Sequence, residues 1–213
     1  MVSVLVVAIA IAVVIVAAVR RADPVKRAAA LRQAGFGLMA VSALFFGGFL
    51  IGEAFADPGG WQAAGLVAAW AAPLAGLSAL SWLRPGWAIY VLAALTAAVI
   101  GVSIWFALNP AGWRSLEDRH GPIRAVITFV LVTAIAVLGL QRTAAAGVLL
   151  LAAGIIPVAV SSVGSFLGLA SLSIVSAAPV ITGILYLASA HTAGRSAPPT
   201  GMGTGPAERP KAA

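Results

Sequence analysis

Apolar residues run along this chain in long uninterrupted stretches, and short polar turns separate one stretch from the next. The first stretch, residues 1–19, carries no charged side chain and is almost entirely Val, Ile, Ala and Leu. A helix of this length measures roughly 28 Å at 1.5 Å per residue, which is close to the thickness of the hydrocarbon layer of a bilayer. Such stretches predict helices that cross a membrane.

Turns rich in Pro and Gly mark the ends of several stretches, because these residues interrupt a helix. They include Asp57-Pro58-Gly59-Gly60, Arg84-Pro85-Gly86 and Asn109-Pro110. A polar break near Ser162 is the least distinct boundary, and whether it separates two full spans stays open. The seven predicted spans are residues 1–19, 34–56, 62–83, 87–108, 123–140, 143–160 and 166–190.

A cleaved signal peptide is the alternative interpretation of the first stretch, and it would leave six spans. Signal peptides carry basic residues before a shorter apolar core and a small-residue cleavage site after it. Here the positive charge follows the apolar run, in the stretch from Arg20 to Arg32, which holds five of the thirteen Lys and Arg residues. The order of charge and apolar residues favours an uncleaved anchor with its N-terminus outside.

The basic residues also set the orientation, since cytoplasmic loops of membrane proteins carry an excess of Lys and Arg. With seven spans and the N-terminus outside, ten of the thirteen basic residues fall on the inner side, and Arg114, Arg119 and Arg124 fall outside. The sequence therefore predicts an all-α, polytopic transmembrane bundle with a cytoplasmic C-terminus. Residues 191–213, rich in Pro, Gly, Ala and Thr, are expected to form a disordered cytoplasmic tail.

Composition supports the membrane assignment and narrows the chemistry. Hydrophobic residues make up 62% of the chain and charged residues 9%, against about 25% charged residues in soluble domains. The absence of Cys excludes disulfides, thiolate catalysis and cysteine zinc sites. The net charge of +7 lies mostly in loops on one side, so it indicates attraction to anionic lipid rather than nucleic-acid binding.

Small residues at helical spacing predict where the spans pack, because close backbone approach drives helix association in lipid. Gly48 and Gly52 form a GxxxG pair, Ala68, Ala72 and Gly76 share one face, and Gly164 and Gly168 form a second pair. These faces are expected to meet inside the bundle, so that Gly48→Leu would destabilise it. They could also bind a membrane-protein partner or a second copy of the chain.

Candidate functional residues are few. Glu53 is the one acid within an apolar run, and a carboxylate there is costly unless it reaches the headgroups or serves an ion or proton site. Arg124 enters the fifth span from the same side and is its candidate partner. Between them along the chain, residues 109–124 fit a short amphipathic helix on the outer surface. That loop holds Glu117, Asp118 and His120, which could ligate a metal but have three Arg residues nearby to compete for the carboxylates.

Enzyme chemistry is not expected from this sequence. It contains no GxSxG, phosphate-binding loop or HExxH motif, and its two His residues, His120 and His191, fall on opposite sides. No cofactor or metal is predicted. The leading hypothesis is a non-enzymatic accessory or structural protein of a bacterial inner membrane, the Ala, Val and Gly bias being typical of a GC-rich genome. A small permease or channel for a neutral or apolar solute is the alternative, suggested by Pro157, Pro179 and the Ser residues near them, and a membrane receptor or sensor is the third hypothesis.

Overall fold

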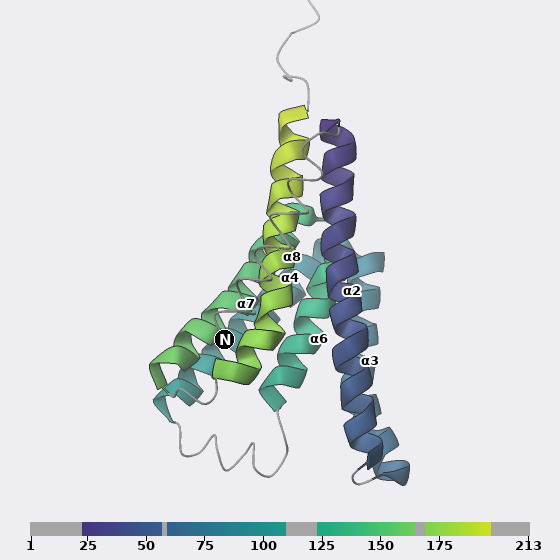
Figure 1. Ribbon diagram of the computed structural model, residues 1–213, viewed down its shortest axis with the longest axis vertical. Coiled ribbons are helices and arrows are strands. Elements are labelled where there is room, and N and C mark those ends of the chain that lie inside the picture. Colours follow the sequence, from purple (N-terminus) through teal and green to yellow (C-terminus); the bar gives the residue numbers. More distant parts are fainter. Residues whose placement is uncertain (1–22, 57–58, 110–122, 165–168, 197–213) are drawn as a thin grey trace, which may run out of the picture.

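The computed structural model describes residues 23–56, 59–109, 123–164 and 169–196, and Figure 1 shows that these segments are almost entirely helical. The helices are α2 (Pro24–Ala56), α3 (Gly60–Leu83), α4 (Pro85–Leu108), α6 (Ile123–Leu138), α7 (Thr143–Gly164) and α8 (Leu169–Ser196). No strand occurs among the described residues. The all-α prediction is therefore confirmed for this part of the chain, whereas the first predicted span, residues 1–19, lies outside it.

The predicted helix-breaking turns occur where the Pro and Gly residues stand. Helix α3 follows α2 after a turn in which Gly59 and Gly60 have φ values of 72° and 58°, a region that glycine enters without steric cost. Pro85 occupies the first position of α4, where its missing N–H removes no helical hydrogen bond. The observed ends of α3 and α4 therefore lie within two residues of the predicted ends.

Two elements extend further than expected. Helix α2 begins at Pro24, so most of the basic stretch up to Arg32, which the sequence places before the span 34–56, is helical as well. The reason is local: Ala28, Ala29, Ala30 and Leu31 are strong helix formers, and the Arg27 N–H donates to the Asp23 carbonyl to close the first turn. Helix α8 continues to Ser196, so the first residues of the predicted tail are helical as well.

Three helical segments are long and apolar enough to cross a membrane: Lys26–Ala56, Gly60–Leu83 and Pro85–Leu108. Two shorter apolar segments, Ala125–Leu138 and Thr143–Pro157, accompany them. By length and composition the chain thus has the character of a membrane protein. Its exposed surface is correspondingly apolar, with large side chains such as Phe45 and Trp61 exposed by 79% and 92%.

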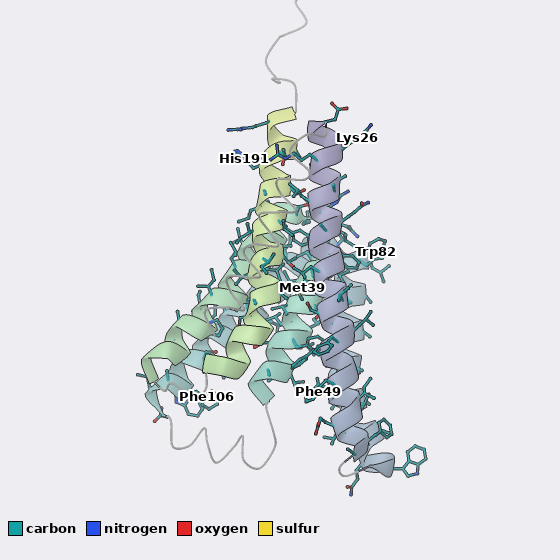
Figure 2. The ribbon with its side chains drawn as sticks, viewed as in Figure 1. Lys26, Met39, Phe49, Trp82, Phe106 and His191 are labelled. Carbon is teal, nitrogen blue, oxygen red and sulfur yellow. The ribbon has the colours of Figure 1, made fainter. Side chains whose placement is uncertain are left out.

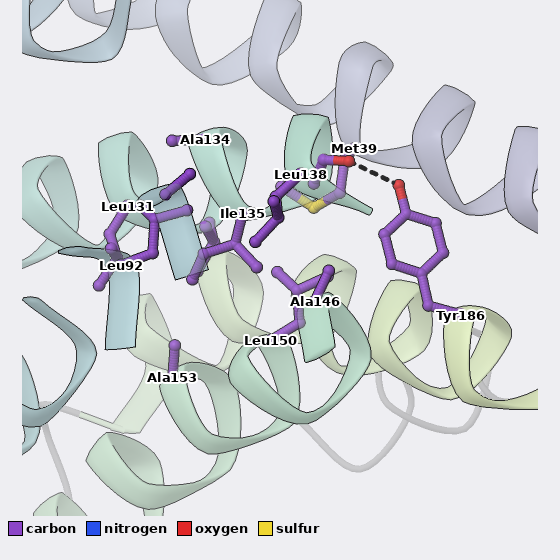
Figure 3. Close-up of a cluster of buried hydrophobic side chains, with 13 residues drawn as sticks. Met39, Leu92, Leu131, Ala134, Ile135, Leu138, Ala146, Leu150, Ala153 and Tyr186 are labelled. Atoms are coloured by element: carbon purple, nitrogen blue, oxygen red, sulfur yellow. Dashed lines mark hydrogen bonds between the residues drawn. The ribbon is translucent and has the colours of Figure 1, made fainter. Parts of the chain in front are cut away.

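Helix α6 forms the centre of the described bundle and contacts α2, α3, α4, α7 and α8. Nearly every side chain from Thr128 to Leu138 is buried. Leu131, Ile135 and Leu138 of α6 lie in one cluster with Leu92 of α4, Leu150 of α7 and Met39 of α2 (Figure 3). Helix α3, by contrast, buries only Ala63 and Ser81.

The helices separate into two groups away from this centre. Helices α2 and α8 lie side by side and extend together beyond the others at one end of the molecule (Figure 1). Toward the opposite end, α2 and α3 diverge from α7 and α8 (Figure 1). An aromatic cluster holds α2 and α3 on α6, with ring centroids 5.0 Å apart for Phe46 and Phe129 and 6.1 Å apart for Trp70 and Phe129.

The packing predicted for the small-residue faces is wrong for Gly48, Gly52 and Gly76. Among the described residues, a Cβ atom added to any of these three glycines would meet no heavy atom within 4 Å. Ala68 and Ala72 are exposed, and the Gly164–Gly168 pair cannot be compared because Gly168 lies outside the described residues. The close contacts are made by other glycines, namely Gly35 in α2, Gly147 and Gly154 in α7, Gly183 in α8 and Gly139 just after α6.

Candidate functional site

The residues singled out from the sequence are not brought together in the described part of the chain. Glu53 lies in the last turn of α2 with an exposed side chain. Arg124 is the second residue of α6, and its side chain is not among those described. Both residues lie toward the same end, beyond the Phe46–Phe129 contact, but their pairing stays a prediction. Glu117, Asp118 and His120 lie outside the described residues, and the described residues contain no group of three metal-ligating side chains.

The polar groups that the structure does bring together lie on one face of α8. Thr182, Tyr186 and Ser189 are spaced by four and three residues, so they share a helical face. We call these three residues the α8 seam. All three are buried. Each hydroxyl donates to a main-chain carbonyl of another helix, which makes the seam the main polar connection between α8 and its neighbours.

The seam ties α8 to α2 at two levels. Thr182 Oγ1 lies 3.3 Å from the Gly35 carbonyl, and Ser189 Oγ lies 2.7 Å from the Ala28 carbonyl. Gly35 and Ala28 are seven residues apart, two turns of α2, as Thr182 and Ser189 are two turns of α8. The two helices therefore run alongside each other over this length, which accounts for the paired extension seen in Figure 1.

Tyr186 connects α8 to α6. Its hydroxyl donates to the Ala136 carbonyl at 2.8 Å, and the side chain is fully buried (Figure 3). The ring lies where side chains of two glycines would otherwise be: a Cβ on Gly139 would stand 1.8 Å from the ring, and a Cβ on Gly35 would stand 2.9 Å from it. Gly139 and Gly35 thus create the space that Tyr186 fills.

Other interior hydroxyls turn back onto their own helices. Ser81, Thr96, Ser103 and Thr133 each donate to the carbonyl four residues earlier, at 2.7–2.8 Å. This arrangement satisfies a polar side chain where water is excluded. Of the Ser residues proposed to line a path near Pro157 and Pro179, only Ser176 has a described side chain, and it is buried.

Basic side chains gather at one end of the molecule. The N-terminal part of α2 and the C-terminal part of α8 lie together there through the Ser189–Ala28 bond. The turn between α6 and α7 reaches the end of α3, since Gln141 Nε2 donates to the Trp82 carbonyl at 2.7 Å. Figure 2 shows Lys26 and His191 at this end, with Phe49 and Phe106 toward the opposite one. We call it the basic end, and its cationic residues are Lys26, Arg27, Arg32, Arg84, Arg142 and Arg195.

Two features of the basic end stand out chemically. Arg27 Nε is buried without a hydrogen-bond partner. A pocket of about 460 Å³ opens between the start of α4 and the α6–α7 turn, and its lining residues are Gly86, Trp87, Ile89, Tyr90 and Arg142. The sequence indicated the charge at this end through the positive-inside pattern. It did not indicate the pocket, because that depends on which two turns meet.

The α8 seam was also missed by sequence reasoning, although a signal for it exists. Three hydroxyl residues at positions 182, 186 and 189 of an apolar helix follow the 3.6-residue period of a single face. Gly139 carries no comparable signal, because its neighbour Tyr186 is distant in the sequence.

Protein-family models, curated proteins and solved structures were compared with this chain, and none matches it. The contacts and charges described above are therefore the basis on which a function can be proposed.

Proposed function

We propose that this chain is a non-enzymatic integral membrane protein that serves as an accessory or structural component of a bacterial inner membrane. The observation that carries the proposal is how the interior polar groups are used. The hydroxyls of the α8 seam bind main-chain carbonyls of α2 and α6, and four further interior hydroxyls, those of Ser81, Thr96, Ser103 and Thr133, bind their own helices. Groups engaged in this way stabilise a bundle and are not free to bind a solute.

The proposed topology has seven spans, an outer N-terminus and a cytoplasmic C-terminus. Its support is the charge distribution, since the basic end collects Lys26, Arg84, Arg142 and Arg195 from four separate helix ends or turns. Glu53 lies at the opposite end of α2. Under the positive-inside rule the basic end faces the cytoplasm.

Cysteine labelling tests this topology cleanly, because the chain contains no Cys and the wild-type protein is its own blank. Gln62→Cys places a thiol at the start of α3, and His191→Cys places one near the end of α8; both positions are exposed. A membrane-impermeant maleimide added to intact cells should label Gln62→Cys. It should label His191→Cys only after the membrane is opened. The reversed pattern would contradict the orientation. Labelling of both variants from outside would contradict an odd number of spans between residues 62 and 191, where the proposed topology has five.

The structural role predicts that the chain works within a larger assembly. In native membranes solubilised gently, it should migrate on a native gel well above the purified chain in the same detergent. Vesicles containing the purified chain should release glycerol or urea no faster than empty vesicles. A chain that is monomeric in both preparations would contradict the proposal. Solute release that is abolished by Thr182→Val but not by Gly101→Ala would favour the permease alternative instead.

The exposed glycines of α2 offer a place for a partner helix in such an assembly. Gly48 and Gly52 lie on a helix surface where an added Cβ meets no heavy atom of the described residues within 4 Å, so another helix could approach the backbone closely. Gly48→Cys should then form a disulfide-linked product in oxidised membranes, either with a second copy or with another chain that carries a thiol. Val41→Cys, also exposed on α2 but two turns away, is the matched control.

A further inference from the structure

The pocket at the basic end is formed by two turns that the fold fixes against each other. Gln141 in the α6–α7 turn donates to the Trp82 carbonyl near the end of α3, and Arg142 follows immediately. Arg142 itself accepts a hydrogen bond from Ala146 in the first turn of α7 through its carbonyl. The backbone that carries the guanidinium is therefore held at one place beside Gly86, Trp87 and Tyr90.

The lining of the pocket combines one cation with two aromatic rings. Arg142 is exposed, and no ion pair with a carboxylate occurs among the residues that the structure describes. A guanidinium presents a fork of N–H donors that matches phosphate oxygens. Trp87 and Tyr90 are exposed by 69% and 74%, and rings of this kind are favoured at the headgroup level of a bilayer. Arg84, also exposed, adds positive charge nearby.

The position of the pocket along α4 places it at the membrane surface. Helix α4 has 24 residues and measures about 36 Å, enough to cross the hydrocarbon layer with its first turn in the headgroup region. The pocket is lined by that first turn. Below it, Ala94, Ala97 and Gly101 continue along the exposed side of the same helix, where an acyl chain would meet only apolar groups.

We propose that this pocket binds the phosphate of an anionic phospholipid headgroup, with Arg142 contacting the phosphate and Trp87 and Tyr90 flanking the glycerol. A soluble phosphate ester shares the charge but lacks the acyl chains. The apolar surface of α4 beneath the pocket favours the lipid. This inference does not depend on the proposed structural role, because a permease could carry the same lipid site.

Native mass spectrometry of the purified full-length chain tests the proposal. Phosphatidylglycerol and phosphatidylcholine with identical acyl chains are added in turn, and glycerol 3-phosphate serves as the soluble probe. The wild-type chain should retain phosphatidylglycerol in preference to phosphatidylcholine and should not retain glycerol 3-phosphate. Arg142→Gln should reduce the preference about fivefold, the effect of one basic residue near an anionic surface. Arg195→Gln is the matched control, since Arg195 lies at the basic end but outside the pocket.

Each outcome has a definite meaning. A wild-type chain that retains both lipids equally overturns the proposal, and so does an Arg142→Gln variant that keeps the full preference. An equal loss in Arg195→Gln assigns the preference to the general charge of the basic end and overturns a defined site. Retention of glycerol 3-phosphate as firmly as the lipid overturns the choice of a lipid. If Arg142→Gln does not fold, Arg142→Lys keeps the charge without the planar fork, and an undiminished preference in that variant overturns the bidentate contact.

Discussion

Gly147 and Gly154 of α7 and Gly183 of α8 stand in apolar helices, as do Gly48 and Gly52 of α2, yet only the first three lie in a close helix contact among the described residues. A Cβ on Gly183 would stand 3.0 Å from the Gly147 carbonyl oxygen, and one on Gly147 would stand 3.1 Å from the Gly183 oxygen. A Cβ on Gly154 would stand 2.8 Å from the Val180 side chain. At Gly48 and Gly52 it would meet nothing within 4 Å.

The difference lies in what stands opposite each glycine. Lipid tails are as apolar as the side chains, so exchanging contacts with lipid for contacts with another helix gives little hydrophobic free energy. Close packing and interhelical hydrogen bonds therefore decide which helix faces meet. Helix α8 supplies both, through Leu187 and Val180 against α7 and through the α8 seam against α2 and α6. The face of α2 that carries Gly48 and Gly52 has neither among the described residues, although the adjacent Gly47 lies against Trp70 and Phe129. Glycine spacing alone therefore does not identify the packed face.

The largest effect is expected at Gly139, where the helix contact is tightest. Gly139→Ala would place a methyl group 1.8 Å from the Tyr186 ring, which is buried and held by its bond to Ala136. Overpacking of this kind costs about 3 kcal/mol or more of unfolding free energy when the neighbour cannot move. The expected result is a large fall in the thermal unfolding midpoint in detergent micelles.

Gly101→Ala is the control for that substitution, because an added Cβ at Gly101 meets nothing within 4 Å. It should leave the midpoint unchanged or raise it slightly, since Ala is the better helix former. Equal midpoints for Gly139→Ala and Gly101→Ala would show that Tyr186 is not packed against Gly139 as described.

A somewhat smaller loss is expected at the crossing of α7 and α8. Gly183→Ala brings a methyl group to 2.9 Å from Leu151 and 3.0 Å from the Gly147 oxygen. The leucine can turn aside but the carbonyl cannot, so we expect a loss of about 2 kcal/mol. Gly194→Ala, in the same helix and free of neighbours within 4 Å, should unfold at the wild-type temperature. A midpoint equal to that of Gly194→Ala would contradict the close crossing.

How much of this the sequence could predict depends on whether the cause is local. Pro85 and Gly59 act on their own backbone, and the turns they predict are present. The charges from Arg20 to Arg32 are typical of a loop and do not indicate the helical start of α2, although Ala28 to Leu31 favour a helix. Gly139 and Tyr186 meet across the fold, and no spacing within either segment indicates that contact. The same holds for Arg142 and Trp87 at the pocket.

A moderate fall in the unfolding midpoint is expected when a hydrogen bond of the α8 seam is removed. Tyr186→Phe keeps the ring in its space and removes only the hydroxyl bond to the Ala136 carbonyl. Interhelical hydrogen bonds in membrane proteins contribute about 0.6 kcal/mol on average, so the midpoint should fall by a small but measurable amount. Tyr90→Phe, whose hydroxyl belongs to a side chain 74% exposed, should not lower it. A Tyr186→Phe variant as stable as Tyr90→Phe would mean that ring packing alone holds α8 to α6.

The smallest effect on the stability of the purified chain is expected for a substitution at Gly48, and the adjacent Gly47 provides the matched comparison. Gly47→Leu would press against Trp70 and Phe129, because a Cβ there already stands 3.5 Å and 3.9 Å from these rings, and we expect it to lose about 1–3 kcal/mol. Gly48→Leu points into open space and should unfold with the wild type. If the exposed face of α2 binds a partner, Gly48→Leu will instead weaken the assembly seen on native gels while leaving the purified chain stable. Weakened assembly together with an unchanged unfolding midpoint would show that Gly48 contacts a partner outside the chain, whereas Gly47 packs inside it. A lowered unfolding midpoint of the purified Gly48→Leu chain would contradict this distinction.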